Sequence, residues 1–112
     1  MKARIPGAQQ NSQANMMKKI QEMQANMEAV QKEIEETVFS SSTGGGIVEA
    51  KVNGAHQVVE INIKPEAVDP DDVEMLQDLI ISAVNESIRK ANEAMESGME
   101  KAKGGLSIPG LF

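Results

Sequence analysis

The sequence contains no cysteine, tryptophan or tyrosine, and its only aromatic side chains are Phe39 and Phe112. Without cysteine the chain has no disulfides, no thiolate metal ligands and no cysteine nucleophile. Large rings usually supply much of the buried area of a small core. A chain of 112 residues with so few rings is therefore expected to bury further surface by pairing with a second copy.

Long apolar runs are also missing. The longest, residues 79–81, is far shorter than the roughly 20 residues that span a membrane. The basic start of the chain, MKARIPGAQQNSQ, is not followed by an apolar run and so does not resemble a secretory signal. We expect a soluble, cytoplasmic protein with no membrane partner.

Three features that often carry chemistry are better explained by structural roles. His56 is the only histidine and lies just after an Asn-Gly turn, which favours a solvated position over a catalytic or metal-binding one. Gly44–Gly46 lacks the Lys-Ser/Thr pair of a phosphate-binding loop, and the acidic residues 69–74 lack the pattern of a calcium loop. We expect no enzyme activity, cofactor, metal or small-molecule substrate.

The net charge of −6 argues at first against an acidic partner, but the charges are unevenly distributed. Residues 1–19 carry four bases and no acid, whereas residues 66–78 carry six acids and no base. The chain is basic again from Lys101 onward. The distribution therefore allows one basic region on an acidic protein.

Residues 16–34, MMKKIQEMQANMEAVQKEI, have apolar side chains spaced alternately by four and three residues, the pattern of a narrow seam along a helix. Ser12 is a suitable N-cap and the pattern ends near Glu36, so a helix over 12–36, about 36 Å long, is predicted. A second helix or a partner chain must cover the seam. The seam residues are Met16, Ile20, Met23, Met27, Val30 and Ile34.

The next segment changes to the period of two that is typical of strands. Residues 37–41, 48–52 and 59–63 are predicted to form a three-stranded antiparallel meander that ends at Pro65. Asn53-Gly54 is suited to positive φ in a tight hairpin. The sheet is expected to bury one apolar face, which carries Val48, Val52, Val59, Ile61 and Ile63.

A second long helix is predicted to start at the acidic run Asp69–Asp72 and to end at Gly104-Gly105. The fold class is therefore α+β: helix, β-meander, helix, in a dimer with projecting helical arms. The predicted organisation is a flexible arm over 1–11, a single domain over 12–103 and a tail over 104–112. The free ends of the helices, residues 12–20 and 95–103, are expected to lie on the same side.

Those free ends hold most of the basic residues without acidic neighbours. Exposed lysines often only keep a surface soluble, but lysines gathered in one place also bind phosphate groups. Methionines in the seams are first of all flexible core fillers. The candidate DNA-binding residues are Lys2, Arg4, Lys18, Lys19, Arg89, Lys90, Lys101 and Lys103.

Four segments together resemble the YbaB/EbfC family of bacterial nucleoid-associated proteins: the Met/Gln-rich first helix, GGGIVEAKVNGAHQVVEINIKPEAV, DVEMLQDLIISAVNESIRKANEAM and the tail GGLSIPGLF. The resemblance covers nearly the whole chain from residue 16. It implies a tweezer-like homodimer that binds double-stranded DNA through helical arms, which correspond here to residues 12–34 and the far half of the second helix.

The expected function is therefore weakly sequence-selective binding of double-stranded DNA by a homodimer in the nucleoid, with effects on nucleoid organisation and gene expression. The shortage of aromatic residues disfavours single-stranded DNA, whose binding usually needs stacking surfaces. The alternative is a protein-binding scaffold or a prefoldin-like holdase, which would use the Met-rich seams as open client surfaces.

Overall fold

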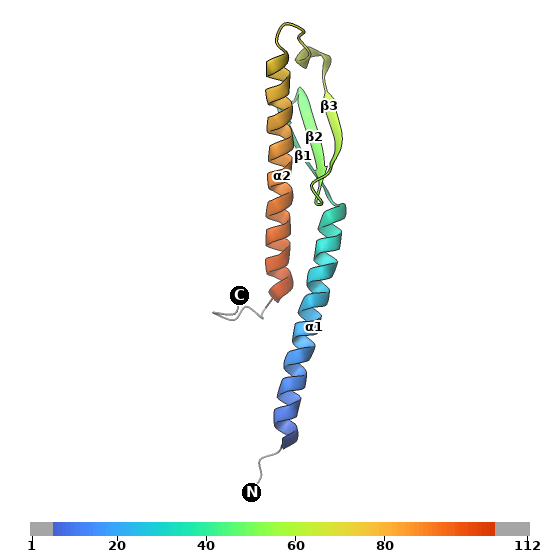
Figure 1. Cartoon of the computed structure of the whole chain (residues 1–112), viewed down its shortest axis with the longest axis vertical. Coiled ribbons are helices and arrows are strands. Elements are labelled where there is room, and N and C mark those ends of the chain that lie inside the picture. The colour runs from blue at the N-terminus through green and yellow to red at the C-terminus, as the bar shows by residue number, and fades with distance from the viewer. Residues whose placement is uncertain (1–5, 105–112) are drawn as a thin grey trace.

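The computed structural model describes residues 6–104, with side chains from residue 12 onward. Two long helices and one small sheet form an elongated molecule of 89 × 24 × 16 Å (Figure 1). This order confirms the predicted α+β fold. The elements are α1 (Pro6–Glu36), β1 (Val38–Thr43), β2 (Val48–Asn53), β3 (Val58–Ile63), the short 3-10 helix η1 (Pro65–Ala67) and α2 (Val73–Lys103).

Helix α1 begins at Pro6, so the predicted start at Ser12 is wrong. Residues 6–11, which the sequence pattern assigned to a flexible arm, are the first turns of the helix. Proline is favoured at the first helical position because its fixed φ suits a helix and its missing N–H would have had no partner there. At 31 residues, α1 is about 46 Å long. Residues 1–5 lie outside the described part of the chain.

The sheet has the order β1-β2-β3, with both neighbouring pairs antiparallel, as predicted. Gly44, Gly45 and Gly46 join β1 to β2 with φ values of 63°, 72° and 97°. Residues with a Cβ rarely adopt such values, which explains the glycine run. The structure thus confirms that these glycines form a hairpin connection.

The second hairpin differs from its prediction. The positive φ of 66° falls on His56, not on Gly54. The side-chain carbonyl of Asn53 accepts hydrogen bonds from the backbone N–H groups of Ala55 and Gln57, each at 3.0 Å. These bonds fix a four-residue loop between β2 and β3 in place of the two-residue turn that Asn-Gly suggests.

The core lies between α2 and one face of β2. Val48, Ala50 and Val52 alternate along β2 and are fully buried. Opposite them α2 presents small residues, which allow the helix to approach the sheet closely. The Ser87 hydroxyl lies 2.9 Å from the carbonyl of Ala83 and 3.0 Å from that of Ala50, so its single proton can bond to the helix or to the strand.

Strand β3 is exposed along its whole length, contrary to the prediction that its apolar residues are buried with those of β2. Val59, Ile61 and Ile63 are 51%, 39% and 39% exposed. The reason is the position of α2, which packs against β1 and β2 and leaves β3 uncovered (Figure 1). Within one chain, β3 therefore forms an apolar edge.

Helix α2 begins and ends as the sequence predicts. The Asp72 side chain accepts a hydrogen bond from the Met75 N–H at 3.1 Å, and the Asp69 side chain accepts one from the Asp71 N–H at 2.9 Å. These bonds confirm the capping role of the acidic run. At the other end, Gly104 adopts a φ of 55° and terminates the helix. Neither long helix of the described chain is apolar enough to cross a membrane.

Candidate nucleic-acid interface

The interface is built on the antiparallel pairing of α1 with the second half of α2, and two glycines set the position of α1. A Cβ on Gly54 would lie 1.9 Å from the carbonyl oxygen of Ile34, and a Cβ on Gly98 would lie 2.7 Å from Cδ1 of Ile34 and 2.8 Å from Cγ1 of Val30. The Gly54 N–H also donates to the Thr37 carbonyl at 3.0 Å. The end of α1 is thus seated against the second hairpin and against α2.

Toward its C-terminus, α2 meets the middle of α1 around a hollow of about 330 Å³. Helix α1 contributes Lys19, Glu22, Met23 and Asn26, and the last turn of α2 contributes Lys101, Ala102, Lys103 and Gly104. The predicted meeting of the two basic segments is therefore observed. Sequence reasoning missed Glu22 and Asn26, because only the helix pairing shows that they face the same hollow.

We call Lys18, Lys19, Lys101 and Lys103 the arm-end lysines. Lys101 and Lys103 lie in the last turn of α2, where the negative end of the helix dipole favours cations. Among the residues that the structure describes, Lys18, Lys19 and Lys101 form no ion pair. Their charges are thus available for an external anion, although Glu22 places one carboxylate in the same hollow.

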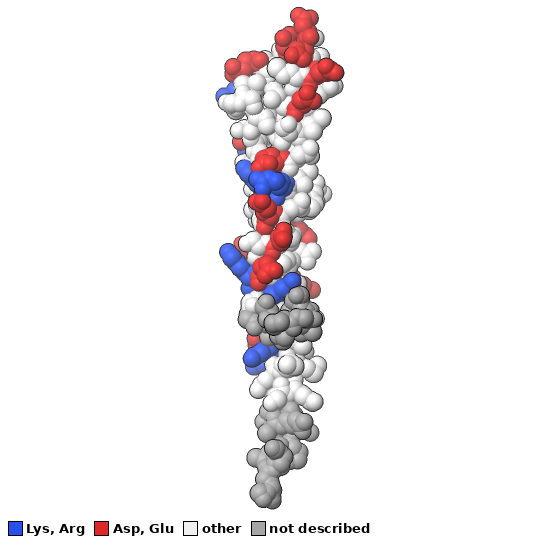
Figure 2. Space-filling model, turned by 90° about the vertical axis from the view of Figure 1, so that its left-hand side faces the viewer, with Lys and Arg blue, Asp and Glu red and all other residues white. Residues whose placement is uncertain are grey.

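One group of acidic residues lies far from the arm-end lysines, at the start of α2. Figure 2 shows Asp and Glu side chains gathered at the end of the molecule where α2 begins, and farther along it shows Lys and Arg side chains lying among further Asp and Glu side chains. The acidic end comprises Glu66, Asp69, Asp71, Asp72, Glu74 and Asp78. A polyanion would therefore be repelled most strongly at the end of the molecule where α2 begins.

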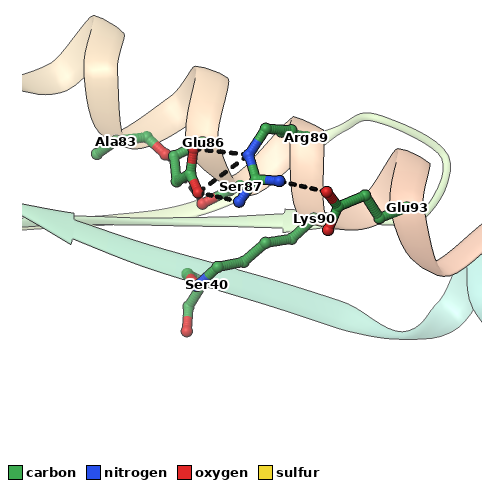
Figure 3. A network of polar contacts seen from close by, with 7 residues as sticks. All are labelled: Ser40, Ala83, Glu86, Ser87, Arg89, Lys90 and Glu93. Carbon is green, nitrogen blue, oxygen red and sulfur yellow. Dashed lines mark hydrogen bonds and ion pairs between the residues drawn. The ribbon is translucent and has the colours of Figure 1, made fainter.

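Arg89 and Lys90 lie midway along α2, away from the arm-end lysines, and each already has partners (Figure 3). The Arg89 guanidinium bonds to Glu86 and Glu93 on the same helix, and the Lys90 ammonium donates to the Ser40 carbonyl at 2.7 Å. The two carboxylates neutralise the charge of Arg89, and the ammonium group of Lys90 is bound at the edge of β1. Lys2 and Arg4 lie outside the described residues.

Two carboxylates have lowered pKa values for local reasons. The hydrogen bond from Arg89 holds the pKa of Glu86 below its ordinary value, and Glu86 and Glu93 in turn raise the pKa of Arg89. On the outer face of the sheet, hydrogen bonds from Asn62 and Lys51 lower the pKa of Glu60. Neither group lies in the hollow, so these shifts do not set its charge.

The helix seam is covered over only part of its length. Val30 and Ile34 pack at Gly98, and Met27 shares a second hollow of about 340 Å³ with Met99 of α2. Met16, which lies beyond the last turn of α2, is 59% exposed, and Ile20, directly after Lys19, is 42% exposed. The chain's own α2 therefore covers most of the seam. This is one of the two predicted arrangements, the other being cover by a partner chain.

No cluster of three or more metal-ligating side chains occurs within residues 6–104 as described. His56 is exposed, and its Nε2 lies 2.6 Å from the Asn92 side-chain oxygen, a contact that ties the second hairpin to α2. The second hairpin thus contacts both helices: Gly54 packs against the end of α1, and His56 contacts α2.

The comparisons with known proteins agree with this architecture. The YbaB/EbfC DNA-binding family matches residues 9–106. A nucleoid-associated protein of Clostridium acetobutylicum is 52% identical over 110 residues, or 98% of both chains. Another, from Alkaliphilus metalliredigens, is 54% identical over 98 residues, covering 88% of this chain and 86% of that protein.

A solved structure also shares the fold. The crystal structure of an uncharacterized protein from Helicobacter pylori matches with a TM-score of 0.58, covering 70% of this chain and 90% of that one. Its sequence is 23% identical, so this likeness concerns the fold alone. The family match and the two relatives span almost all of the sequence. The chain belongs to the YbaB/EbfC DNA-binding family.

Proposed function

We propose that this protein binds double-stranded DNA as a homodimer, with little sequence preference, through the arm-end lysines. The observation that carries the proposal is the convergence of Lys19, Lys101 and Lys103, from two helices, around one hollow. Lysines held at a fixed spacing can each approach a backbone phosphate, and the release of counterions from DNA then drives binding. Binding of this kind would localise the protein to the nucleoid in the cytoplasm and influence nucleoid organisation and gene expression.

The low sequence preference follows from the kind of side chains present. Lysine recognises phosphate as a compact charge, whereas base reading needs bidentate side chains presented in a groove. Asn26 in the hollow is the one side chain there with both a donor and an acceptor in its amide. Stacking on single-stranded bases would need aromatic rings, and the sequence has no Trp or Tyr.

The homodimer is supported by the contrast between the two edges of the sheet. At the β1 edge Lys90 bonds to the Ser40 carbonyl, which protects that edge from pairing with another strand. At the β3 edge Val59, Ile61 and Ile63 are exposed instead. An apolar edge strand of this length is a surface for another chain, and we propose that a second copy packs against β3.

Sedimentation can test the dimer. Ile61→Lys places a charge on the proposed interface, so this variant should sediment as a monomer. Ser42→Lys places the same charge on β1, at the other edge of the sheet, and should leave the dimer intact. A wild-type protein that sediments as a single chain, or equal behaviour of the two variants, would refute an interface at β3.

The holdase alternative has weaker support. It requires the Met-rich seam to be open to clients, whereas Val30 and Ile34 pack closely against Gly98 of the same chain. The exposed part of the seam is limited to the turns of α1 that carry Met16 and Ile20. We therefore propose DNA, not an unfolded protein, as the partner.

Fluorescence anisotropy with a labelled duplex tests the proposed contact. Replacing Lys19 and Lys101 with alanine should weaken duplex binding at low salt by about tenfold or more, because up to four phosphate contacts per dimer are lost. The matched control replaces Lys32 and Lys64, which are also exposed, and changes the net charge equally. Equal losses in both variants would show that net charge, not the arm-end position, determines affinity.

A further inference from the structure

Helix α1 carries an apolar surface that nothing in the described chain covers. Helix α2 ends at Lys103, and its last residues lie beside Lys19 and Met23. The preceding turns of α1 extend past this end (Figure 1). These turns carry Met16 and Met17, which are 59% and 62% exposed, and Ile20, directly after Lys19, is 42% exposed. Met16 and Ile20 continue the seam that α2 covers farther along α1.

We propose that the C-terminal tail of the same chain, residues 105–112, packs on this uncovered part of α1. The tail has the sequence GLSIPGLF and carries no charged side chain. Half of its residues are large and apolar: Leu106, Ile108, Leu111 and Phe112. Such a segment gains more from an apolar surface than from water. Its placement lies outside the described residues.

The starting point and length of the tail favour this site. Residue 104 lines the hollow beside Lys19 and Met23, so the tail begins about two turns from Met16. Met16 precedes Met23 by seven residues, which is about 10 Å along a helix. An eight-residue segment can extend about 26–29 Å. The tail can therefore cover Met16, Met17 and Ile20 without being fully extended.

The other apolar surface, on β3, is much less accessible to the tail. Ile61 pairs with Ala50, and the Ala50 carbonyl lies beside the hydroxyl of Ser87. Ser87 precedes Gly104 by 17 residues, so the tail would have to run back about 26 Å along α2 to reach that level. This distance uses almost the full reach of the tail before any contact is made.

Disulfide trapping tests the proposal directly, because the sequence has no native cysteine. Ser12→Cys lies on the seam side of α1, four residues before Met16, and Ala14→Cys lies at the same level on nearly the opposite side. Each is combined with Gly110→Cys in the tail, which is six residues after Gly104 and therefore within about 20–22 Å of it. An intrachain disulfide should form about tenfold faster or more with Ser12→Cys than with Ala14→Cys, since both pairs share the same tether and only one faces the docked tail.

The other outcomes overturn the proposal. Equal rates for the two pairs would show that the tail does not bind the seam side of α1. A disulfide that joins two chains would assign the site to the partner's tail. Disulfide trapping is carried out without DNA, so a failure here is separate from a failure of the proposed function.

Amide hydrogen exchange in the full-length chain gives a second measurement. Replacing Leu106 and Ile108 with serine should speed exchange across residues 14–20 and leave residues 24–34, which α2 covers, unchanged. Ser107→Ala is the matched control and should exchange like the wild type. Unchanged exchange over residues 14–20 in the double variant would contradict tail docking.

Discussion

Gly98→Ala is the sharpest test of the close packing of α1 on α2. In an open position of a helix, glycine to alanine stabilises a protein by about 1 kcal/mol, because alanine loses less backbone entropy on folding. At Gly98 the added methyl group would lie 2.7 Å from Cδ1 of Ile34 and 2.8 Å from Cγ1 of Val30. Both distances are far shorter than the 3.5–4.0 Å or so at which carbon atoms attract.

Overpacking of this kind typically costs about 1–3 kcal/mol. Set against the gain of about 1 kcal/mol in helix propensity, the expected net effect is between no change and a loss of about 2 kcal/mol. Chemical denaturation at one fixed protein concentration measures this quantity, since the stability of an oligomer depends on concentration. Ser97→Ala, at the neighbouring exposed position, reports helix propensity alone and should be mildly stabilising.

Shortening the two contacting side chains provides the decisive comparison. Val30→Ala and Ile34→Val remove the methyl groups that the new Cβ would strike. In their presence Gly98→Ala should become stabilising, which gives a favourable coupling of about 1–3 kcal/mol in the mutant cycle. If Gly98→Ala stabilises the otherwise unchanged protein by about 1 kcal/mol, the close packing of α1 on α2 is refuted.

Three further predictions follow from individual side chains. Glu22→Gln removes the carboxylate from the lysine-lined hollow and should raise duplex affinity several-fold in an anisotropy titration, about the effect of one charge; an unchanged affinity would place DNA elsewhere. The buried Ser41 hydroxyl has no partner among the described residues, so Ser41→Ala should leave stability unchanged or raise it by about 1 kcal/mol in urea denaturation, and a clear loss would contradict this. Arg89→Gln should return the pKa of Glu86 toward its ordinary 4.5, as followed by NMR titration. Because the folded-state pKa is lowered, the stability that the pair contributes is present above about pH 4.5 and is lost as the pH falls through the folded pKa, so the variant should differ from wild type near neutrality and not in acid.

Local patterns were sufficient to predict most of the fold. The seam from Met16 to Ile34 specified α1, alternation along Val48 to Val52 specified β2, and the acidic run ending at Asp72 specified the start of α2. Each signal depends on residues close together in the sequence. The same patterns could not show that α2 covers β1 and β2 but not β3, because strands with alternating apolar residues look alike whether a helix or a partner chain covers them.

The site was predictable only in part. The charge distribution identified the arm-end lysines, and the order of elements placed both basic segments on the same side of the molecule. The hollow depends on the register between α1 and α2, which Gly54 and Gly98 determine through contacts with Ile34. An isolated glycine in a long helical pattern, such as Gly98, is a signal of close packing, but it does not identify its neighbour. Asn53-Gly54 likewise resembled a tight-turn signal, and the sequence did not show that Gly54 packs against the carbonyl group of Ile34.

The salt dependence of duplex binding tests the central claim most directly. The logarithm of the association constant should fall linearly with the logarithm of salt concentration, with a slope of about −0.9 for each phosphate neutralised. If Lys19 and Lys101 of both subunits contact phosphates, replacing them with alanine should make the slope shallower by about 3.6. A slope that is unchanged in this variant would contradict DNA binding at the arm-end lysines.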